Sequence, residues 1–352
     1  MAIVTTSEVH DRVKHVDALK DEIEILKSRI EDHDTGHIHT AISVLESRVK
    51  ELSSWIVQNY WEYKMILIDL NQVMISNLMM QINSNASNVI DENMVRHMVL
   101  NSIRMYNMKF KDSYGDIVIC CDDKKYWRRD YFPYYKAGRK KDREASPFDW
   151  NLIFETLNKV RDEIKEYFPY KVIQVDKTEA DDVIATLTHK FGVPLKNSTT
   201  EKILILSSDK DFMQLQKFAN VEQYSPMGKK FLRTNTPEAF LKEHIIRGDR
   251  SDGIPNFMSS DDTFVVEARQ KPVTEKKLNK WLEEEPESFC DEVMLRNYKR
   301  NELLIDLSKI PTEYQEKILD AYDNTPKRGR EKLLNYFIQN RMKQLMEHIQ
   351  EF

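Results

Sequence analysis

Four short apolar runs limit most strongly how this chain of 352 residues can fold. The runs are residues 65–69, 117–121, 171–175 and 203–206. Amphipathic patterns of helical period, such as residues 94–110 and 150–167, lie between them. Because helices cover both faces of a parallel sheet, its strands read as short, continuously apolar segments that alternate with helices. The sequence therefore predicts an α/β fold whose central sheet is mostly parallel and flanked by helices.

The segments on either side of this pattern differ from it. Between residues 8 and 56, aliphatic side chains recur at heptad spacing on both sides of Gly36. This spacing is typical of a coiled coil, formed either by a helical hairpin that turns at Gly36 or by one long helix with a stutter. Beyond residue 255 only amphipathic helical patterns remain. We therefore expect three parts: a coiled-coil or helical-hairpin extension (1–64), an α/β domain (65–255) and a helical C-terminal domain (256–352).

Acidic residues gather where the predicted strands end. Asp69 and Asp122 follow the first two strands, and Asp209 and Asp211 follow the strand at 203–206. Because ligands of an open α/β sheet bind at the carboxyl edge of its strands, we expect these acids to face one shared site. Two further motifs, EADD at 179–182 and GDRSDG at 248–253, supply Glu179, Asp181, Asp182, Asp249 and Asp252.

Each acidic motif, taken singly, has a structural interpretation. An aspartate after a strand is often a helix N-cap, and acids suit the first turn of a helix. Five motifs at one sheet edge point instead to bound cations, because crowded carboxylates would otherwise be driven toward protonation. Ligand sets made only of oxygen suit Mg²⁺, for which Mn²⁺ can substitute. Since two such ions promote phosphodiester hydrolysis, we predict a two-metal site.

One segment carries a dense positive charge. Residues 124–143 hold nine lysines and arginines against two aspartates, a local charge of +7 in a protein whose formal net charge is −5. Interleaved aromatic residues are typical of a clamp on single-stranded nucleic acid, although a solvated helix with inward-facing aromatics has the same composition. The segment leaves the predicted sheet directly after Asp122, beside the acids. We predict nucleic-acid binding by Lys124, Lys125, Trp127, Arg128, Arg129, Tyr134, Tyr135, Lys136, Arg139, Lys140 and Lys141.

Together, the ordered motifs resemble those of the 5′-nuclease, or flap endonuclease, superfamily. They are ILID (66–69), CCDD (120–123), EADD (179–182), SSDKDF (207–212) and GDRSDGIPN (248–256). The tract YWRRDY at 126–131, with the ending QEF at 350–352, is similar to the ribonuclease H branch found in T-even bacteriophages. The likeness covers residues 65–352, so the extension lies outside it.

The resemblance implies a role for each matched residue. It assigns Asp69, Asp122, Asp181 and Asp209 to the first metal ion, and Asp211, Asp249 and Asp252 to the second. Glu179 would support the site between the ions, and Asp182 would be a neighbouring outer acid. Lys136 and Arg128 resemble basic residues of an arch, here residues 124–150, that touch the scissile phosphate. The implied catalytic residues are therefore Lys136, Arg128, Asp209 and Asp122, with two Mg²⁺ as cofactors.

The resemblance also implies a function. It indicates a Mg²⁺-dependent, structure-specific 5′→3′ nuclease, with ribonuclease H, exonuclease and flap endonuclease activity, that removes RNA primers and adjacent DNA during lagging-strand replication. Its ligands would be RNA–DNA hybrids, 5′ flaps and nicked duplex DNA. Two other functions remain open: a PIN-type RNA-processing nuclease, which usually lacks the long arch and GDRSDG, and a non-catalytic DNA-binding or replication assembly protein, in which the acids would be eroded.

The extension and the composition suggest partners and a compartment. Residues 8–56 are expected to mediate self-association or docking to a replisome component such as a single-strand DNA-binding protein. No apolar run approaches the length of a membrane span, so we expect no membrane contact. Three cysteines cannot form a disulfide framework. We therefore expect a cytoplasmic protein, in the host cell if a phage encodes it.

Overall fold

The structure, a computed structural model, describes the whole chain except residues 1–5, 31–35, 60–63, 85–90, 193–201 and 327. By its internal contacts the chain divides into two compact units. The first is Met1–Lys64 with Ser198–Glu201, and the second is Met65–Asn197 with Lys202–Phe352. Within the described residues, no helix is long and apolar enough to cross a membrane.

The first unit contains two helices that pack against each other. They are α1 (Thr6–Lys27) and α2 (Gly36–Asn59). Buried members of the predicted heptad seams are Val16, Ile23, Ile42 and Leu52. Two separate helices correspond to the hairpin rather than to one long helix with a stutter, and residues 31–35 between them lie outside the described residues. Supercoiling of the pair into a coiled coil stays a prediction.

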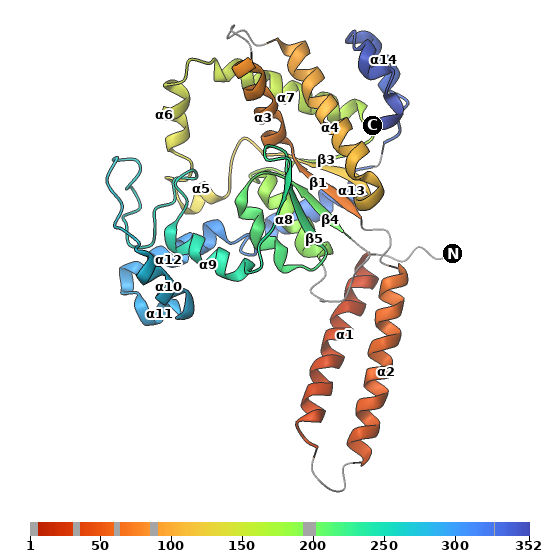
Figure 1. Cartoon of the computed structure of the whole chain (residues 1–352), viewed down its shortest axis with the longest axis vertical. Helices are drawn as coiled ribbons and strands as arrows, with labels where there is room; N and C mark the ends of the chain where they lie inside the picture. The colour runs from red at the N-terminus through yellow and green to blue at the C-terminus, as the bar shows by residue number, and fades with distance from the viewer. Residues whose placement is uncertain (1–5, 31–35, 60–63, 85–90, 193–201, 327) are drawn as a thin grey trace. The chain divides into compact units, whose positions relative to one another are not determined.

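The second unit is built on a six-stranded sheet with the strand order β3-β2-β1-β4-β5-β6 (Figure 1). The strands are β1 (Met65–Asp69), β2 (Asp116–Cys120), β3 (Lys171–Ile173), β4 (Ile203–Leu206), β5 (Val221–Ser225) and β6 (Lys230–Leu232). Every neighbouring pair is parallel except β5 with β6. The predicted α/β fold with a mostly parallel sheet is therefore confirmed.

Helices cover both faces of this sheet, which explains why its central strands are apolar throughout. Ile66 and Ile68 of β1 belong to one core with α3 (Leu70–Ser84), α4 (Glu92–Tyr114) and α7 (Trp150–Tyr167). Leu67 points to the opposite face, because side chains alternate along a strand. Helices α8 (Ala180–Phe191) and α13 (Thr312–Asn324) contact the sheet as well.

The C-terminal helices divide between two cores. A second core around Phe257 contains residues of α9 (Pro237–Arg247), α10 (Glu275–Glu283), α11 (Pro286–Phe289) and α12 (Glu292–Ile305). The chain then returns to the first core through α14 (Leu333–Gln339), α15 (Lys343–Met346) and η2 (Ile349–Glu351). Phe352 packs against Phe168, with ring centroids 5.4 Å apart. Because of this return, the predicted boundary at residue 255 does not separate compact units.

The sheet has a switch point between its two central strands. The chain adds β2 and β3 on one side of β1, and then β4 and β5 on the other side. Such a reversal leaves a crevice at the carboxyl ends of the central strands, where α/β folds bind ligands. Ile68 of β1 pairs with Leu206 of β4. The next residue along the chain from each, Asp69 and Ser207, therefore lies at this crevice.

Candidate active site

Four acids lie around the switch point, and we call Asp69, Asp122, Asp181 and Asp209 the acid group. Asp69 ends β1, Asp122 lies two residues beyond β2, Asp181 lies in the first turn of α8, and Asp209 caps the 3₁₀ helix η1 (Lys210–Lys217) that follows β4. Asp69 accepts hydrogen bonds from Gln72 N at 3.1 Å and from Ser207 Oγ at 3.3 Å. The sequence analysis predicted that these acids lie at one edge of the sheet, and the structure places them there.

The acid group lacks cationic partners. Within the described part of the chain, no ion pair links its members to a lysine or arginine. Burial, and then the charges of Asp122 and Asp209, raise the pKa of Asp69 to about 7. The pKa of Asp181 rises well above its usual value through burial and through repulsion by Asp209 and Asp69. Mutual repulsion of this kind shows that the carboxylates share one electrostatic environment.

Three other acids at the same edge are neutralised, and we call Glu179, Asp182 and Asp252 the paired group. Glu179 accepts from Arg128 Nη1 at 2.8 Å and forms an ion pair with Lys136. Burial opposes its charge, but Lys136 and Arg128 outweigh that cost and lower the pKa of Glu179 to about 2. Asp182 lies 2.8 Å from Arg128 Nη2, and Asp252 lies 2.8 Å from Arg139 Nη2.

The structure corrects the nucleic-acid interface predicted for the arch. Trp127, Arg128, Tyr135 and Lys136 are buried. The indole nitrogen of Trp127 donates to Asp182 Oδ2 at 3.0 Å, and its ring, which is 1 % exposed, stacks on Tyr314. Arg128 also donates to Leu304 O at 3.0 Å. Because these side chains already fill internal positions, they are closed to bases and phosphates in this conformation.

The rest of the predicted interface is accessible. The exposed members are Lys124, Lys125, Arg129, Lys140 and Lys141, and the half-buried members are Tyr134 and Arg139. Tyr131, one of the interleaved aromatic residues expected to stack on unpaired bases, is 61 % exposed. In Figure 1 the arch contains two short helices, α5 (Arg128–Tyr131) and α6 (Gly138–Glu144), and α6 stands away from the sheet.

The backbone of Lys136 joins the arch to the loop that follows α9. Lys136 has a positive φ of 54°, which costs a non-glycine residue about 1–3 kcal/mol. Its N–H donates to Asp252 O at 2.7 Å, and its Nζ lies 3.5 Å from Asp252 Oδ2. Burial opposes the charge of Lys136, but Glu179 and Asp252 raise its pKa overall. Lys136 is therefore held as a cation beside the acids.

A histidine that the sequence analysis did not predict joins the remaining acids. His244 Nδ1 lies 3.3 Å from Asp211 Oδ1, and Nε2 lies 3.4 Å from Asp249 Oδ2. We call Asp211, His244 and Asp249 the histidine cluster. The turn that brings Asp249 back requires Gly248, whose φ is 69° and whose added Cβ would lie 2.4 Å from Ile254 O. Asp252 was predicted beside Asp211 and Asp249, but its side chain contacts the arch instead.

The two carboxyl groups of the histidine cluster have pKa values that are shifted in opposite directions. Burial and the charge of Asp209 raise the pKa of Asp211 to about 8, against the influence of His244. Burial works in the same direction on Asp249, but hydrogen bonds from His244 and Ser251 lower its pKa overall. A hollow of about 500 Å³ reaches both carboxyls and His244.

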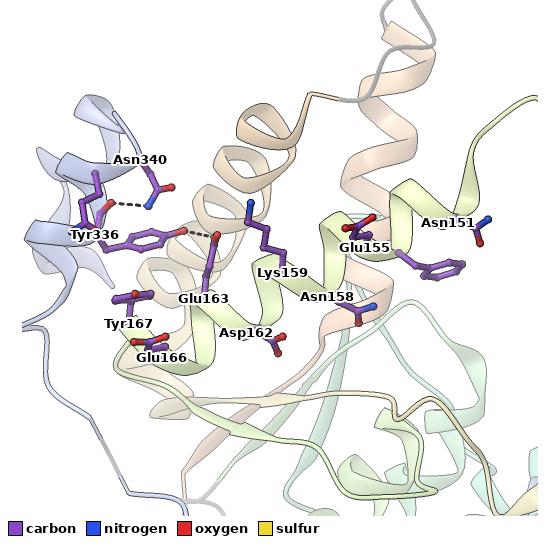
Figure 2. Close-up of a pocket in the computed structure, with 12 residues that line it drawn as sticks. Asn151, Glu155, Asn158, Lys159, Asp162, Glu163, Glu166, Tyr167, Tyr336 and Asn340 are labelled. Carbon is purple, nitrogen blue, oxygen red and sulfur yellow. Dashed lines mark hydrogen bonds between the residues drawn. The ribbon is translucent and has the colours of Figure 1, made fainter.

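A larger hollow lies elsewhere and does not suit the predicted substrate. It has a volume of about 760 Å³ and is lined by residues of α7 and α14, as Figure 2 shows. Tyr336 donates to Glu163 Oε2 at 2.7 Å across it. Its charged lining is Glu155, Asp162, Glu163 and Glu166 against Lys159. This acidic lining would repel nucleic acid, and it contains none of the predicted site residues.

The residues at the switch point fit the predicted metal ions. The acid group offers only oxygen ligands, which hard divalent cations prefer. Its carboxylates have raised pKa values and form no ion pair with a basic side chain among the described residues, so a divalent cation would supply the missing charge. The histidine cluster adds a nitrogen, and its three ligand atoms lie within 4.8 Å of one another.

Comparison with known proteins decides the family. The model of the "5'-3' exonuclease, N-terminal resolvase-like domain" family matches residues 64–244. This chain belongs to the 5′-3′ exonuclease family. A second family model, "T4 RNase H, C terminal", matches residues 235–352 of this 5′-3′ exonuclease. The protein is therefore a hydrolase with 5′-3′ exonuclease activity, which ends the non-catalytic alternative.

Two relatives found by sequence agree with this assignment. The 5′-3′ exonuclease is 38% identical to Ribonuclease H of Enterobacteria phage T4 over 296 residues, which are 81% of this chain and 95% of the relative. It is 27% identical to the 5'-3' exonuclease of Buchnera aphidicola subsp. Acyrthosiphon pisum over 42% of this chain and 49% of that protein. A solved structure, "Crystal Structure of T5 D15 Protein Co-crystallized with Metal Ions", overlaps 74% of this chain and 98% of that chain with a TM-score of 0.48 at 16% identity.

Proposed function

We propose that this 5′-3′ exonuclease is a Mg²⁺-dependent, structure-specific nuclease that removes RNA primers and adjacent DNA during lagging-strand replication. The observation that supports this most is the acid group at the switch point, where unpaired carboxylates from separate elements share one environment. The relationship to Ribonuclease H of phage T4 supports the choice of substrate. RNA–DNA hybrids, 5′ flaps and nicked duplex DNA are therefore the proposed ligands.

The proposed metal ligands come from two clusters. The first Mg²⁺ would be held by the acid group, and the second by Asp211 and Asp249. When bound, such a pair of ions activates a water molecule and stabilises the leaving oxygen of a phosphodiester. Asp252 would act through Tyr135 and Arg139, which it contacts, and not as a primary ligand. Glu179 and Asp182 would hold Arg128 and so position the start of α8.

The chain's own basic residues would orient the substrate. Lys136 Nζ is enclosed by Glu179 and Asp252, so it would act on a scissile phosphate at the acids through its positive charge and not by direct contact in this conformation. Arg128 is enclosed by Leu304 O, Glu179 and Asp182, so we assign it a positioning role in place of the predicted contact with the phosphate. The exposed lysines of the arch and Tyr131 would bind the single strand that leads to the site.

A substrate panel tests this function. The full chain would be incubated with a 5′-labelled flap, an RNA–DNA hybrid, a nicked duplex and a single-stranded RNA, first with Mg²⁺ and then with EDTA. We expect cleavage from the 5′ end of the flap and of the RNA strand with Mg²⁺, and none with EDTA. Cleavage of single-stranded RNA alone would favour the PIN-type alternative, and cleavage that persists in EDTA would contradict the metal-dependent mechanism.

We also propose that the two-helix unit mediates self-association. Its exposed aliphatic residues include Ile25, Ile30 and Val44, of which Val44 is 63 % exposed. Burying such side chains between two copies would supply the driving force for association. Light scattering of the full chain should give more than the monomer mass of 41.8 kDa, and Val44→Asp should reduce it. A monomeric mass for the full chain at micromolar concentration would contradict self-association.

A further inference from the structure

A histidine lies where the proposed ligands of the second metal ion meet. His244 is in the last turn of α9, one turn before Gly248, and Asp211 comes from η1. The side chains of Asp211, His244 and Asp249 are all between 17% and 19% exposed. Each offers a ligand atom, and the three atoms lie within 4.8 Å of one another, a spacing that one cation can bridge. The histidine cluster is therefore a site with both nitrogen and oxygen donors.

The two ring nitrogens of His244 have different surroundings. Nε2 faces Asp249 Oδ2, while the other oxygen of Asp249 accepts from Ser251 N and Ser251 Oγ, both at 2.7 Å. Nδ1 is buried and has no hydrogen-bond partner in the described part of the chain, although Asp211 Oδ1 lies 3.3 Å away. Metal-ligating histidines commonly donate one N–H to a carboxylate and bind the ion through the other nitrogen. Asp249 is placed to receive that N–H, which leaves the lone pair of Nδ1 for a cation. Asp249 would then support the second ion through His244 and not as a direct ligand, which revises the ligand pair proposed above.

We propose that His244 binds, through Nδ1, the metal ion shared with Asp211, and that this nitrogen ligand makes the second site prefer Mn²⁺ to Mg²⁺. The inference rests on the proposed metal-dependent function and deepens it. Imidazole suits first-row transition ions, whereas carboxylate and water suit Mg²⁺. The acid group, with oxygen donors alone, lacks this preference. The two metal positions would therefore differ in selectivity, with the nitrogen-containing one as the discriminating site.

Access from solvent and the hydrogen bonds that fix Asp249 support the same assignment. The hollow of about 500 Å³ that reaches Asp211, His244 and Asp249 gives an ion a path from solvent. Its lining also includes Arg247, whose charge is balanced by ion pairs with Glu243 and Glu275. Asp249 is fixed by the backbone N–H of Ser251, so the carboxylate that orients His244 is itself held in place. Such outer support is typical of histidines that bind metals.

The direct test is to detect the nitrogen on the metal. The full chain would be given less than one equivalent of Mn²⁺, and electron spin-echo envelope modulation would be recorded for ¹⁴N bound to the ion. We expect ¹⁴N modulation in the unmodified protein and its loss in His244→Asn. The matched control is His348→Asn, because His348 also lies beside a carboxylate, with Nδ1 2.9 Å from Glu351 Oε1, but outside the cluster. His348→Asn should keep the signal.

Calorimetry measures the selectivity that follows. In His244→Asn the Mn²⁺ dissociation constant should rise about tenfold or more, whereas the Mg²⁺ constant should change less than about threefold. An equal change for both ions would contradict a discriminating role. Circular dichroism would check that His244→Asn folds. If this variant does not fold, the spin-echo spectrum of the unmodified protein with Mn²⁺ still tests the inference.

The outcomes separate this inference from the proposed function. Absence of ¹⁴N modulation in the unmodified protein, or its persistence in His244→Asn, would overturn the role of His244. If Mg²⁺-dependent flap cleavage is intact in that case, only the inference fails. If the protein binds neither Mn²⁺ nor Mg²⁺ and cleaves nothing, the proposed function fails as well.

Discussion

The acid group and the paired group lie at the same edge of the sheet but differ in how their charge is balanced. In the paired group, basic side chains contact every carboxylate, and the pKa of Glu179 falls to about 2. In the acid group no such contact exists among the described residues, and the pKa of Asp69 rises to about 7. Both groups are crowded with acids. The difference is that the protein's own basic residues balance the charge of one group, whereas we propose that a bound cation balances the charge of the other.

Two adjacent residues display this difference most sharply. Asp181 and Asp182 are consecutive in the first turn of α8, and the helix dipole favours negative charge at both positions. Asp182 points to Arg128 and Trp127, whereas Asp181 is repelled by Asp209 and Asp69. A run of acids in a sequence can therefore combine one ion-paired residue, Asp182, and one residue without such a partner among the described residues, Asp181, which we propose as a metal ligand. The predictions below test that division.

The largest effect is expected in the acid group. Asp209→Asn removes a charged oxygen ligand, so cleavage of a 5′-labelled flap should fall about 10³-fold or more. The matched control is Asp123→Asn, because Asp123 is next to Asp122 but accepts from Lys177 N at 3.0 Å outside the acid group. Asp123→Asn should cleave at close to the normal rate. Similar losses in both variants would mean that activity depends on general acidity at this edge.

Breaking the paired group should mainly cost stability. Glu179→Gln removes one charged partner from each of the buried residues Lys136 and Arg128, which then keep only Asp252 and Asp182, so the free energy of unfolding should fall by about 3 kcal/mol. Urea denaturation of the full chain measures this. Glu313→Gln is the control, since Glu313 forms an exposed ion pair with Lys317 at 3.8 Å and should change stability by less than about 1 kcal/mol. A loss for Glu179→Gln no larger than the control's would contradict the role of the paired group.

The adjacent aspartates should respond in opposite directions. Without metal, Asp181→Asn removes a repelled charge and should raise the free energy of unfolding by about 1 kcal/mol. Asp182→Asn breaks the ion pair with Arg128 and should lower it by about 1–3 kcal/mol. Denaturation in EDTA near pH 8 compares the two variants. Changes of the same sign would remove the distinction between the groups.

The last expected effect is a pH dependence of the metal-free protein. The pKa values of Asp69 and Asp211 rise from 3.8 to about 7 and about 8 on folding, so the folded state binds more protons between these limits. The free energy of unfolding should therefore fall as pH rises from about 4 to about 8. The pKa of Glu179 is lowered to about 2, so its ionised form stabilises the folded state throughout this pH range. Its stabilising contribution is lost only in acid and does not offset this trend. Melting in EDTA should occur several degrees lower near pH 8.5 than near pH 5.5. If the melting temperature of the metal-free protein stays constant or rises between these two pH values, the prediction is wrong.

The sequence predicts the centre of the fold better than its edges. Strands β1 and β4 coincide with apolar runs because both of their faces are buried. The pattern missed β5 and β6, since Val221–Ser225 contains polar residues and β6 is an exposed edge strand. The acid group follows from strand order, because strands of a parallel sheet end at one edge.

The sequence could not distinguish roles that depend on distant partners. Arg128 and Trp127 read as a nucleic-acid clamp, but their partners Glu179, Asp182 and Leu304 lie far along the chain. His244 was missed because a single histidine in an amphipathic helix carries no signal by itself. Its position one turn before the glycine of GDRSDG was the available hint, and its second partner Asp211 is remote in sequence.

Proton release on metal binding tests the central claim most directly. At about pH 7 the metal-free protein should hold protons on Asp211 and, in part, on Asp69, because their pKa values are about 8 and about 7. Titration calorimetry with Mg²⁺, repeated in two buffers of different ionisation enthalpy, counts the protons that binding displaces. The account predicts saturable binding with release of about one proton. Binding heats that are the same in both buffers, or no Mg²⁺ binding, would contradict the claim that these carboxylates await a cation.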